Sequence, residues 1–269
     1  MIRLFSIFIK EYRCELRLVF TELVGINKRY CVNLCHKNRK ILRTDKSRFV
    51  HIKNNKNYME INLVSDTITK PSREMLVHML NAVVGDDVYK QDPTVIELEA
   101  KVADMFGMEA GLFFPSGTMA NQTAIKLHTQ PGEQLIADKY AHVYHYEGGG
   151  VSFNSGVSCC LLDGNRGMIT AEQVAGAIND PEFYHSPLTS LVCVENTTNK
   201  GGGACYELED LQRIKQVCDA NNLKFHMDGA RIWNALVAKK QDPKAFGKLF
   251  DTISVCLSKG LGAPIGSVL

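Results

Sequence analysis

The amino-acid sequence predicts an α/β fold in which a mainly parallel sheet is covered by helices on both faces. Beyond residue 58, short apolar runs typical of buried strands alternate with amphipathic segments of helical length. The chain has 269 residues, which is enough to bury a large core. It has no uncharged apolar run of about 18 to 20 residues, which a membrane-spanning helix requires.

Capping boxes and turn residues set the boundaries of several expected elements. In a capping box, a Thr side chain and a Glu or Gln side chain three residues later each bond the other residue's backbone N–H. Thr94 with Glu97 and Thr170 with Gln173 fit this pattern, and Gly107 is a typical helix stop. The expected elements are, in order, a helix over 94–106, a strand over 112–114, a helix opened by Pro115-Ser116-Gly117-Thr118, a helix over 170–178, a strand over 190–194, a helix over 208–220 and strands over 224–227 and 252–257.

The N-terminal segment differs in charge from the rest of the chain. Residues 1–58 hold 14 of the 31 basic residues but only four of the 29 acidic ones, a net charge of +10. Residues 59–269 hold the other 17 basic and 25 acidic residues, a net charge of −8. We expect residues 1–58 to be a basic, disordered extension and the folded body to begin at residue 59. The acidic body argues against nucleic acid as its partner.

The expected location is the cytoplasm, with mitochondria as the alternative. The N-terminal segment is rich in Arg and poor in acids, as mitochondrial presequences are, but it is not rich in Ser. An odd number of cysteines without repeated metal-ligand spacing predicts reduced thiols and no metal site. The nine cysteines are Cys14, Cys31, Cys35, Cys159, Cys160, Cys193, Cys205, Cys218 and Cys256.

Three groups of polar or small residues follow apolar runs, where ligands bind in parallel sheets. Ser116-Gly117-Thr118 opens a helix whose free N–H groups suit a phosphate. Asp228 and Lys259 follow two later strands. Taken singly, these residues could be a helix cap, a turn residue and a surface lysine. Together they match what pyridoxal 5'-phosphate requires: a phosphate cradle, a carboxylate for the pyridinium nitrogen and an amine for the Schiff base.

At these residues the sequence becomes similar to a known family. Residues 61–269 resemble the low-specificity threonine aldolases, pyridoxal-phosphate enzymes of the aspartate-aminotransferase-like superfamily (fold type I). The resemblance implies a three-layer large domain followed by a C-terminal small domain. The matching segments are LVSDTITKP (63–71), VGDDVY (84–89), DPTVIELE (92–99), FFPSGTMANQ (113–122), HVYHYE (142–147), HMDGARIWNA (226–235) and LSKGLGAPIGSV (257–268).

The resemblance implies a role for five residues toward the cofactor. Lys259 would form the Schiff base, and Asp228 would bind the pyridinium nitrogen and keep it protonated. Gly117 and Thr118 match positions that hold the phosphate. His142 matches a histidine that stacks on the cofactor ring and takes part in catalysis, whereas His145 and His226 are expected to be ordinary histidines.

The implied substrate is a small β-hydroxy amino acid. Ser65 and Arg231 match residues that bind its carboxylate, where a guanidinium can form a bidentate pair. The implied reaction is the retro-aldol cleavage of L-threonine or L-allo-threonine to glycine and acetaldehyde. Holding the carboxylate selects the Cα–Cβ bond for cleavage. The resemblance also implies that the full-length protein is a homo-oligomer, a dimer or a tetramer, with no membrane or nucleic-acid partner.

Two departures from the family pattern leave alternatives open. Many relatives have a second histidine where this chain has Thr198, and threonine cannot act as a base near neutral pH. The chain also ends at Leu269, shortly after Lys259, so we expect the small domain to be missing. The alternatives are a catalytically weak or inactive product that at most binds the cofactor, and a related β-eliminating lyase or an aldolase for bulkier substrates.

Overall fold

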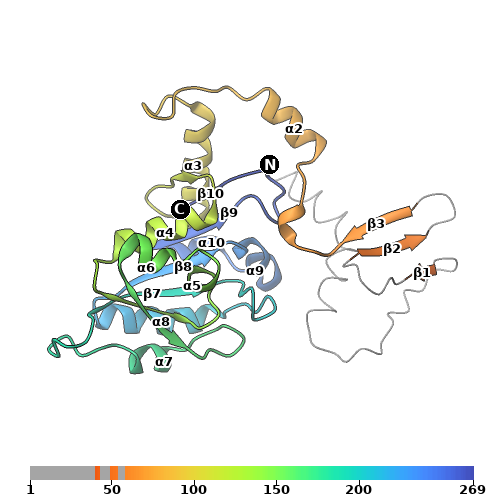
Figure 1. Ribbon diagram of the computed structural model, residues 1–269. Helices are drawn as coiled ribbons and strands as arrows, with labels where there is room; N and C mark the ends of the chain where they lie inside the picture. Colours follow the sequence, from red (N-terminus) through yellow and green to blue (C-terminus); the bar gives the residue numbers. More distant parts are fainter. Residues whose placement is uncertain (1–39, 43–48, 54–57) are drawn as a thin grey trace. The chain divides into compact units, whose positions relative to one another are not determined.

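The computed structural model describes residues 40–42, 49–53 and 58–269 (Figure 1). The chain divides into two compact units, Met1–Ser65 and Asp66–Leu269. We treat each unit by itself and call the second one the body. Among the described residues, no helix is both long enough and apolar enough to cross a membrane.

The described part of the N-terminal unit is an antiparallel sheet with the strand order β1-β2-β3. Its strands are β1 (Lys40–Leu42), β2 (Phe49–Lys53) and β3 (Tyr58–Asn62). The unit extends past residue 59, the expected start of the folded body, because β3 pairs with β2. Strands β1 and β2 lie within 1–58, and the rest of that segment lies outside the described residues. Its assignment as a disordered extension therefore stays a prediction.

The body contains a seven-stranded sheet with the order β4-β10-β9-β8-β7-β5-β6. Neighbouring strands from β9 to β6 are parallel, and β10 is antiparallel to both β4 and β9. The expectation of a mainly parallel sheet is confirmed. The strands are β4 (Phe113–Phe114), β5 (Gln134–Asp138), β6 (Ser158–Leu162), β7 (Thr189–Glu195), β8 (Lys224–Gly229), β9 (Thr252–Cys256) and β10 (Ser267–Val268).

Helices cover both faces of this sheet, because alternate side chains of each central strand enter different apolar clusters. In β7, Val192 and Val194 belong to one cluster, and Leu191 and Cys193 belong to the other. The first cluster is completed by α3, α7, α8, α9 and α10, and the second by α4, α5 and α6 (Figure 1). The body is therefore three-layered, as expected.

The helices of the body begin and end close to the expected residues. The 208–220 helix has the expected bounds, and the capping box of Thr170 and Gln173 is present. The helical elements are the 3₁₀ turn η1 (Asp66–Ile68), α2 (Arg73–Leu80), α3 (Pro93–Phe106), α4 (Gly117–His128), α5 (His142–His145), α6 (Gly150–Ser155), α7 (Ala171–Gly176), α8 (Leu208–Ala220), α9 (Ile232–Lys239) and α10 (Pro243–Gly247).

The expected capping box at the start of α3 is wrong. The N-cap is Asp92, whose carboxylate accepts hydrogen bonds from the backbone N–H groups of Thr94 and Val95. The Thr94 hydroxyl instead donates to the carbonyl oxygen of Val83, at 2.5 Å. Asp92 caps the helix because Pro93 fits its first position, where no backbone N–H is needed. The helix ends at Gly107 in the left-handed conformation (φ 65°), as expected.

Candidate functional site

The candidate site lies at the carboxyl edge of the parallel strands. Glu195 at the end of β7 pairs with Asp228 on β8, and Asp228 pairs with Ser254 on β9. Lys259 lies in the turn that follows β9. The parallel arrangement therefore places two acidic residues and the turn that carries the lysine at the same end of the strands, although they are far apart in the sequence.

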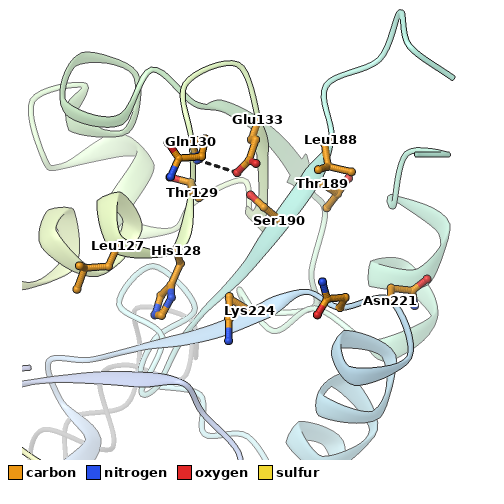
Figure 2. A pocket seen from close by; sticks show the side chains of 11 residues that line it. Leu127, His128, Thr129, Gln130, Glu133, Leu188, Thr189, Ser190, Asn221 and Lys224 are labelled. Atoms are coloured by element: carbon orange, nitrogen blue, oxygen red, sulfur yellow. Dashed lines mark hydrogen bonds between the residues drawn. The ribbon is translucent and has the colours of Figure 1, made fainter. Parts of the chain in front are cut away.

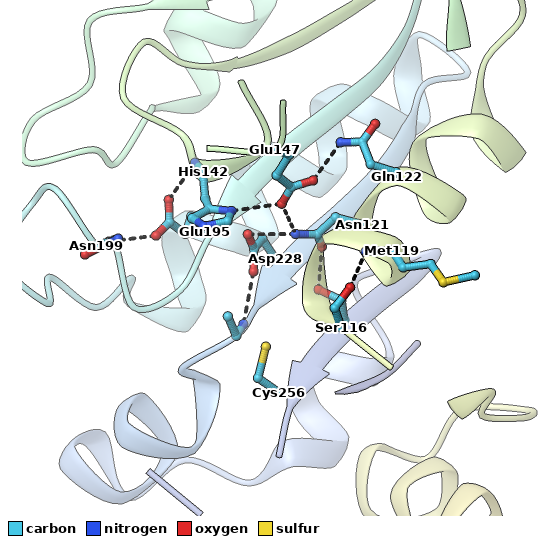
Figure 3. Close-up of polar contacts among 12 residues, drawn as sticks. Ser116, Met119, Asn121, Gln122, His142, Glu147, Glu195, Asn199, Asp228 and Cys256 are labelled. Atoms are coloured by element: carbon cyan, nitrogen blue, oxygen red, sulfur yellow. Dashed lines mark hydrogen bonds and ion pairs between the residues drawn. The ribbon is translucent and has the colours of Figure 1, made fainter. Parts of the chain in front are cut away.

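Asp228 is buried, with 4% of its surface exposed. One carboxylate oxygen accepts a hydrogen bond from the side-chain amide of Asn121 at 2.9 Å, and the other accepts one from the backbone N–H of Ala230 at 3.1 Å (Figure 3). A buried carboxylate remains ionised only where donors or cations replace water. Asn121 and Ala230 supply such donors.

The start of α4 forms a narrow cradle next to the end of β9. The Ser116 hydroxyl accepts from the backbone N–H of Met119, while the first N–H groups of a helix have no partner inside the helix. A Cβ atom at Gly117 would lie 2.8 Å from the Cys256 sulfur, so no larger residue fits there without displacement. The exposed Thr118 follows in the first turn. A phosphate group suits this combination of small residues, free N–H groups and helix dipole.

Lys259 lies beside the same cysteine. Its Nζ atom is 3.6 Å from the sulfur of Cys256, and its backbone oxygen accepts a hydrogen bond from the Thr69 hydroxyl at 2.6 Å. Cys256 also accepts from the Ser267 hydroxyl at 3.4 Å. Lys259 and Gly117 thus both lie next to Cys256, and their joint action on one ligand stays a prediction.

His142 begins α5, after β5, and is held by two carboxylates. Its ring Nδ1 is 2.9 Å from Glu147 Oε1, and its backbone N–H donates to Glu195 at 3.2 Å. The hydrogen bond with Glu147 raises the pKa of His142, and the charges of Asp228, Glu147 and Glu195 add to this effect, against the opposing effect of burial. Because Nδ1 binds Glu147, Nε2 is the ring atom available for proton transfer.

Glu147 joins His142 to Asp228 through one amide. Asn121 donates from Nδ2 to Glu147 and to Asp228, at 2.9 Å each, and Gln122 donates to the second oxygen of Glu147 at 2.6 Å (Figure 3). The nitrogen and oxygen atoms of His142, Glu147 and Asp228 that could act as ligands lie within 4.8 Å of one another. Glu147 is bonded directly to His142, and Asn121 bonds both Glu147 and Asp228.

Glu195 is a third buried carboxylate, with 8% of its surface exposed. It accepts hydrogen bonds from the backbone N–H groups of His142 and Asn199. Burial, together with the nearby charge of Asp228, raises the pKa of Glu195 to about 7. This side chain therefore titrates near neutral pH.

The remaining predicted site residues have different surroundings. Arg231, directly after β8, forms a two-point ion pair with Asp66, so its guanidinium already binds a carboxylate. Ser65 belongs to the N-terminal unit, and its role toward the substrate stays a prediction. The Thr198 hydroxyl donates to the carbonyl oxygen of Arg166 at 2.9 Å. The Thr198 hydroxyl is therefore used in a bond to the backbone.

Three side chains of this network received no role from the sequence. Asn121, Glu147 and Glu195 lie in recognisable segments, but their roles depend on contacts made only in the folded chain. The available signal was the position of each residue: Asn121 is in the first turns of α4, and Glu195 ends a buried strand. Polar side chains at such strand ends and helix starts are candidates for a ligand site.

Comparisons with known proteins identify the family to which the sequence is similar. Residues 62–269 match the family model described as beta-eliminating lyase. The low-specificity L-threonine aldolase of Saccharomyces cerevisiae is 44% identical over 210 residues, which are 77% of this chain and 54% of that protein. The enzyme of the same name from Escherichia coli K12 is 41% identical over 210 residues, 78% of this chain and 62% of that protein. The chain spans about half to three fifths of the length of such curated relatives.

Solved structures support the same fold. A threonine aldolase structure from Leishmania major has a TM-score of 0.65 at 22% identity, covering 76% of this chain and 60% of that one. The structure of a putative L-allo-threonine aldolase from Listeria monocytogenes has a TM-score of 0.59. At this level of identity the likeness concerns the fold.

Proposed function

Because the chain belongs to the beta-eliminating lyase family, we propose that it is a pyridoxal-phosphate-dependent aldehyde-lyase. The proposed reaction is the cleavage of L-threonine or L-allo-threonine to glycine and acetaldehyde. The observation that carries the proposal is the single site in which Lys259 and the Gly117 cradle meet at Cys256, beside the buried, hydrogen-bonded carboxylate Asp228. The names of the relatives support the choice of substrate.

The residues at this site fit the cofactor. The exposed N–H groups at the start of α4, with Gly117 and Thr118, would hold the phosphate. Asp228 would hold a proton on the ring nitrogen, because its carboxylate is kept in place by Asn121 and Ala230. Lys259 would bind the cofactor through its amine. When bound, pyridoxal 5'-phosphate supplies an acceptor for the electron pair released by a breaking bond at the substrate Cα.

The chain's own residues would select and complete the reaction. His142 would take the proton of the substrate β-hydroxyl at Nε2, since Nδ1 binds Glu147 and Thr198 is bonded to a backbone carbonyl. Loss of that proton breaks the Cα–Cβ bond and releases the aldehyde, and protonation of Cα gives glycine. Arg231 would bind the substrate carboxylate, and the predicted role of Ser65 toward the same carboxylate is part of the proposal. Fixing the carboxylate aligns the Cα–Cβ bond for cleavage.

A test of this function uses trapping by reduction. The chain is mixed with pyridoxal 5'-phosphate, reduced with borohydride and digested, and the modified peptide is identified by mass spectrometry. We expect the label on Lys259, and no label at that peptide in Lys259→Ala. Lys244→Ala, which changes a half-exposed surface lysine paired with Asp104, should label as the wild type does. A label spread over surface lysines in the wild type would contradict the proposed cofactor.

Product analysis with threonine then separates the candidate reactions. Aldol cleavage gives glycine and acetaldehyde, whereas β-elimination gives ammonia and a keto acid. Labelling of Lys259 without either set of products would favour the alternative in which this chain binds the cofactor but is catalytically weak. We expect Lys259→Ala to reduce glycine formation by orders of magnitude.

The proposed assembly of the full-length protein is a homo-oligomer, a dimer or a tetramer. Its support is a group of exposed apolar side chains between residues 76 and 89 of the body, since large exposed apolar surfaces often mark interfaces. This group contains Leu76, Val77, Met79, Leu80, Val83, Val84, Val88 and Tyr89. Light scattering coupled to size-exclusion chromatography measures the mass, and a monomer at micromolar concentration would contradict the proposal.

The proposed location is the cytoplasm, with mitochondria as the alternative. The six cysteines among the described residues are free thiols, which fits a reducing compartment. A fusion of residues 1–58 to a fluorescent reporter distinguishes the two locations.

A further inference from the structure

A continuous line of hydrogen bonds crosses the sheet and ends at Asp228. It begins at His128, the last residue of α4, whose Nε2 is 3.0 Å from the Thr252 hydroxyl. The same hydroxyl is 2.8 Å from Nδ1 of His226, the register neighbour of Thr252 on β8. Nε2 of His226 is 3.2 Å from Oδ1 of Asn121, which donates from Nδ2 to Asp228.

The two carboxylates at one end determine the orientation of the Asn121 amide. Asn121 Nδ2 uses one of its two hydrogens on Asp228 and the other on Glu147. Oδ1 therefore points away from them and must accept. It accepts from the Ser254 hydroxyl at 2.6 Å and lies against His226 Nε2. That ring nitrogen must consequently carry a hydrogen.

The hydrogen on His226 Nε2 determines the hydrogen-bond roles of Thr252 and His128. His226 is fully buried, and desolvation lowers its pKa to about 4, so the ring is neutral at pH 7 with its only proton on Nε2. Nδ1 is then an acceptor, and the Thr252 hydroxyl must donate to it. The oxygen of Thr252 in turn accepts from His128 Nε2–H. Each donor in the line therefore points toward Asp228.

We infer that Asn121 and His226 are positioning residues, which hold the Asp228 carboxylate in one orientation, with Thr252 and His128 as the outer part of the same line. The role toward a cofactor rests on the proposed function, but the direction of the hydrogen bonds does not. The line has an electrostatic effect on the buried carboxylates. Asp228 lies next to Glu195 on the adjacent strand, and Glu147 lies on the other side of Asn121. Aligned donors compensate buried negative charge that would otherwise be costly.

The outer end of the line lies where the parallel strands begin, opposite the candidate site. His128 contributes to a pocket of about 280 Å³ that Lys224 and Thr189 also line, and these two residues begin β8 and β7 (Figure 2). The line therefore runs from a pocket at the amino ends of the strands to the candidate site at their carboxyl ends. His226 connects the two, although its sequence position suggested only an ordinary strand histidine.

The first test measures the ring tautomer of His226 without any cofactor. In the intact chain labelled with ¹⁵N-histidine, the ring nitrogen shifts identify a neutral His226 with its proton on Nε2 from pH 6 to pH 8. A proton on Nδ1, or a charged ring at pH 7, would overturn the inference. This measurement stands whether or not the chain binds pyridoxal phosphate, so it separates the two proposals.

Thr252→Val tests the next link, because valine removes the hydroxyl but keeps the shape. We expect the Nδ1 resonance of His226 to move toward that of a free acceptor while the proton stays on Nε2. Thr129→Val is the matched control, since the Thr129 hydroxyl donates to the Ile125 carbonyl at 2.7 Å and this buried residue also lines the pocket. Equal His226 shifts in the two variants would contradict the line.

The role toward the cofactor is tested by the conservative exchange of His226. A glutamine amide can place a donor near the position of Nε2, whereas an asparagine amide is too short. We expect His226→Asn to raise the Kd for pyridoxal phosphate about tenfold, the effect of losing a hydrogen bond that supports a charge, and His226→Gln to recover most of it. Equal affinities of the two variants would overturn the positioning role.

Discussion

Arg231 and Asp66 form a bidentate ion pair in the body. The guanidinium Nε and Nη2 atoms donate to the two oxygens of the Asp66 carboxylate, at 2.6 and 2.8 Å. This is the geometry that an Arg side chain would use for a substrate carboxylate. Substrate binding at Arg231 would thus replace one carboxylate by another, and Asp66 keeps the guanidinium oriented until then.

Asp66→Asn should change how stability depends on acid. Burial raises the pKa of the Asp66 carboxyl, but the hydrogen bond and charge of Arg231 outweigh it and hold the pKa below its ordinary value. The contribution of the pair is therefore present above the unfolded-state pKa and is lost as the pH falls through the folded-state pKa. At pH 7 we expect a loss of less than about 1 kcal/mol, because the pair is partly exposed.

Urea unfolding of both proteins at pH 7 and at pH 3 measures this difference. The wild type should lose its advantage over Asp66→Asn at the lower pH. An advantage of equal size at both pH values would show that the ion pair does not contribute in this way.

Glu147→Gln should lower the pKa of His142. The hydrogen bond with Glu147 is the largest cause of the raised pKa, and the neutral amide removes the charge that favours the imidazolium. In the wild type, the stability from this pair is complete below the unfolded-state pKa and is lost as the pH rises through the folded-state pKa. An NMR titration of the His142 ring checks the shift, with Glu133→Gln, at the amino end of β5, as the control. An unchanged titration midpoint in Glu147→Gln would be the contrary result.

Glu195→Gln should flatten the pH dependence of stability below neutral pH. The carboxyl has a pKa of about 7 in the folded chain, above the ordinary value of 4.5 for a glutamate. Between these values the folded state binds the proton more tightly, so stability falls as the pH rises, by at most about 1.4 kcal/mol per pH unit. Glutamine has no such proton. The slope of Tm against pH from 5 to 7 should be less negative in the variant than in the wild type. Parallel slopes would speak against a titrating Glu195.

Phe225→Ala should destabilise the body strongly. Phe225 on β8 is fully buried and its ring stacks on Phe250 with a centroid distance of 4.2 Å. Removing a buried aromatic ring leaves a cavity and costs about 3–5 kcal/mol. Phe153→Ala is the control, because 89% of Phe153 is exposed and its loss should cost less than about 0.5 kcal/mol. Urea denaturation measures both, and similar losses would contradict the packing described.

Much of the fold of the body could be predicted because its elements follow simple periodicities. The helix α8 repeats apolar residues at helical spacing, and Leu211, Ile214 and Cys218 form its buried stripe. The start of α3 was misplaced because both Asp92 and Thr94 are good helix caps, and only the fold shows that Thr94 bonds Val83 instead. Local preference cannot decide between two suitable caps two residues apart.

The site could be predicted in part. Asp228 and the residues around Gly117 and Lys259 lie at the strand ends that the apolar runs predicted, whereas no strand was predicted before His142. Asn121 could not be foreseen as their connection, because its hydrogen bond to Asp228 joins residues 107 positions apart in the sequence. The ion pair of Arg231 with Asp66 spans 165 positions and was missed for the same reason. A single sequence contains no direct information on such pairings.

The position of β10 between β4 and β9 has a consequence for biosynthesis. Phe113 and Phe114 pair with Val268 and Ser267, so β4 joins the sheet only through a strand made roughly 150 residues later. At ribosomal rates of about 5–20 residues per second, this delay amounts to ~8–30 s. During that interval the parallel strands can associate, but β4, next to the start of α4, has no strand partner. In a nascent chain of this protein, Phe113 and Phe114 therefore wait for residues 267–268 before they can join the sheet.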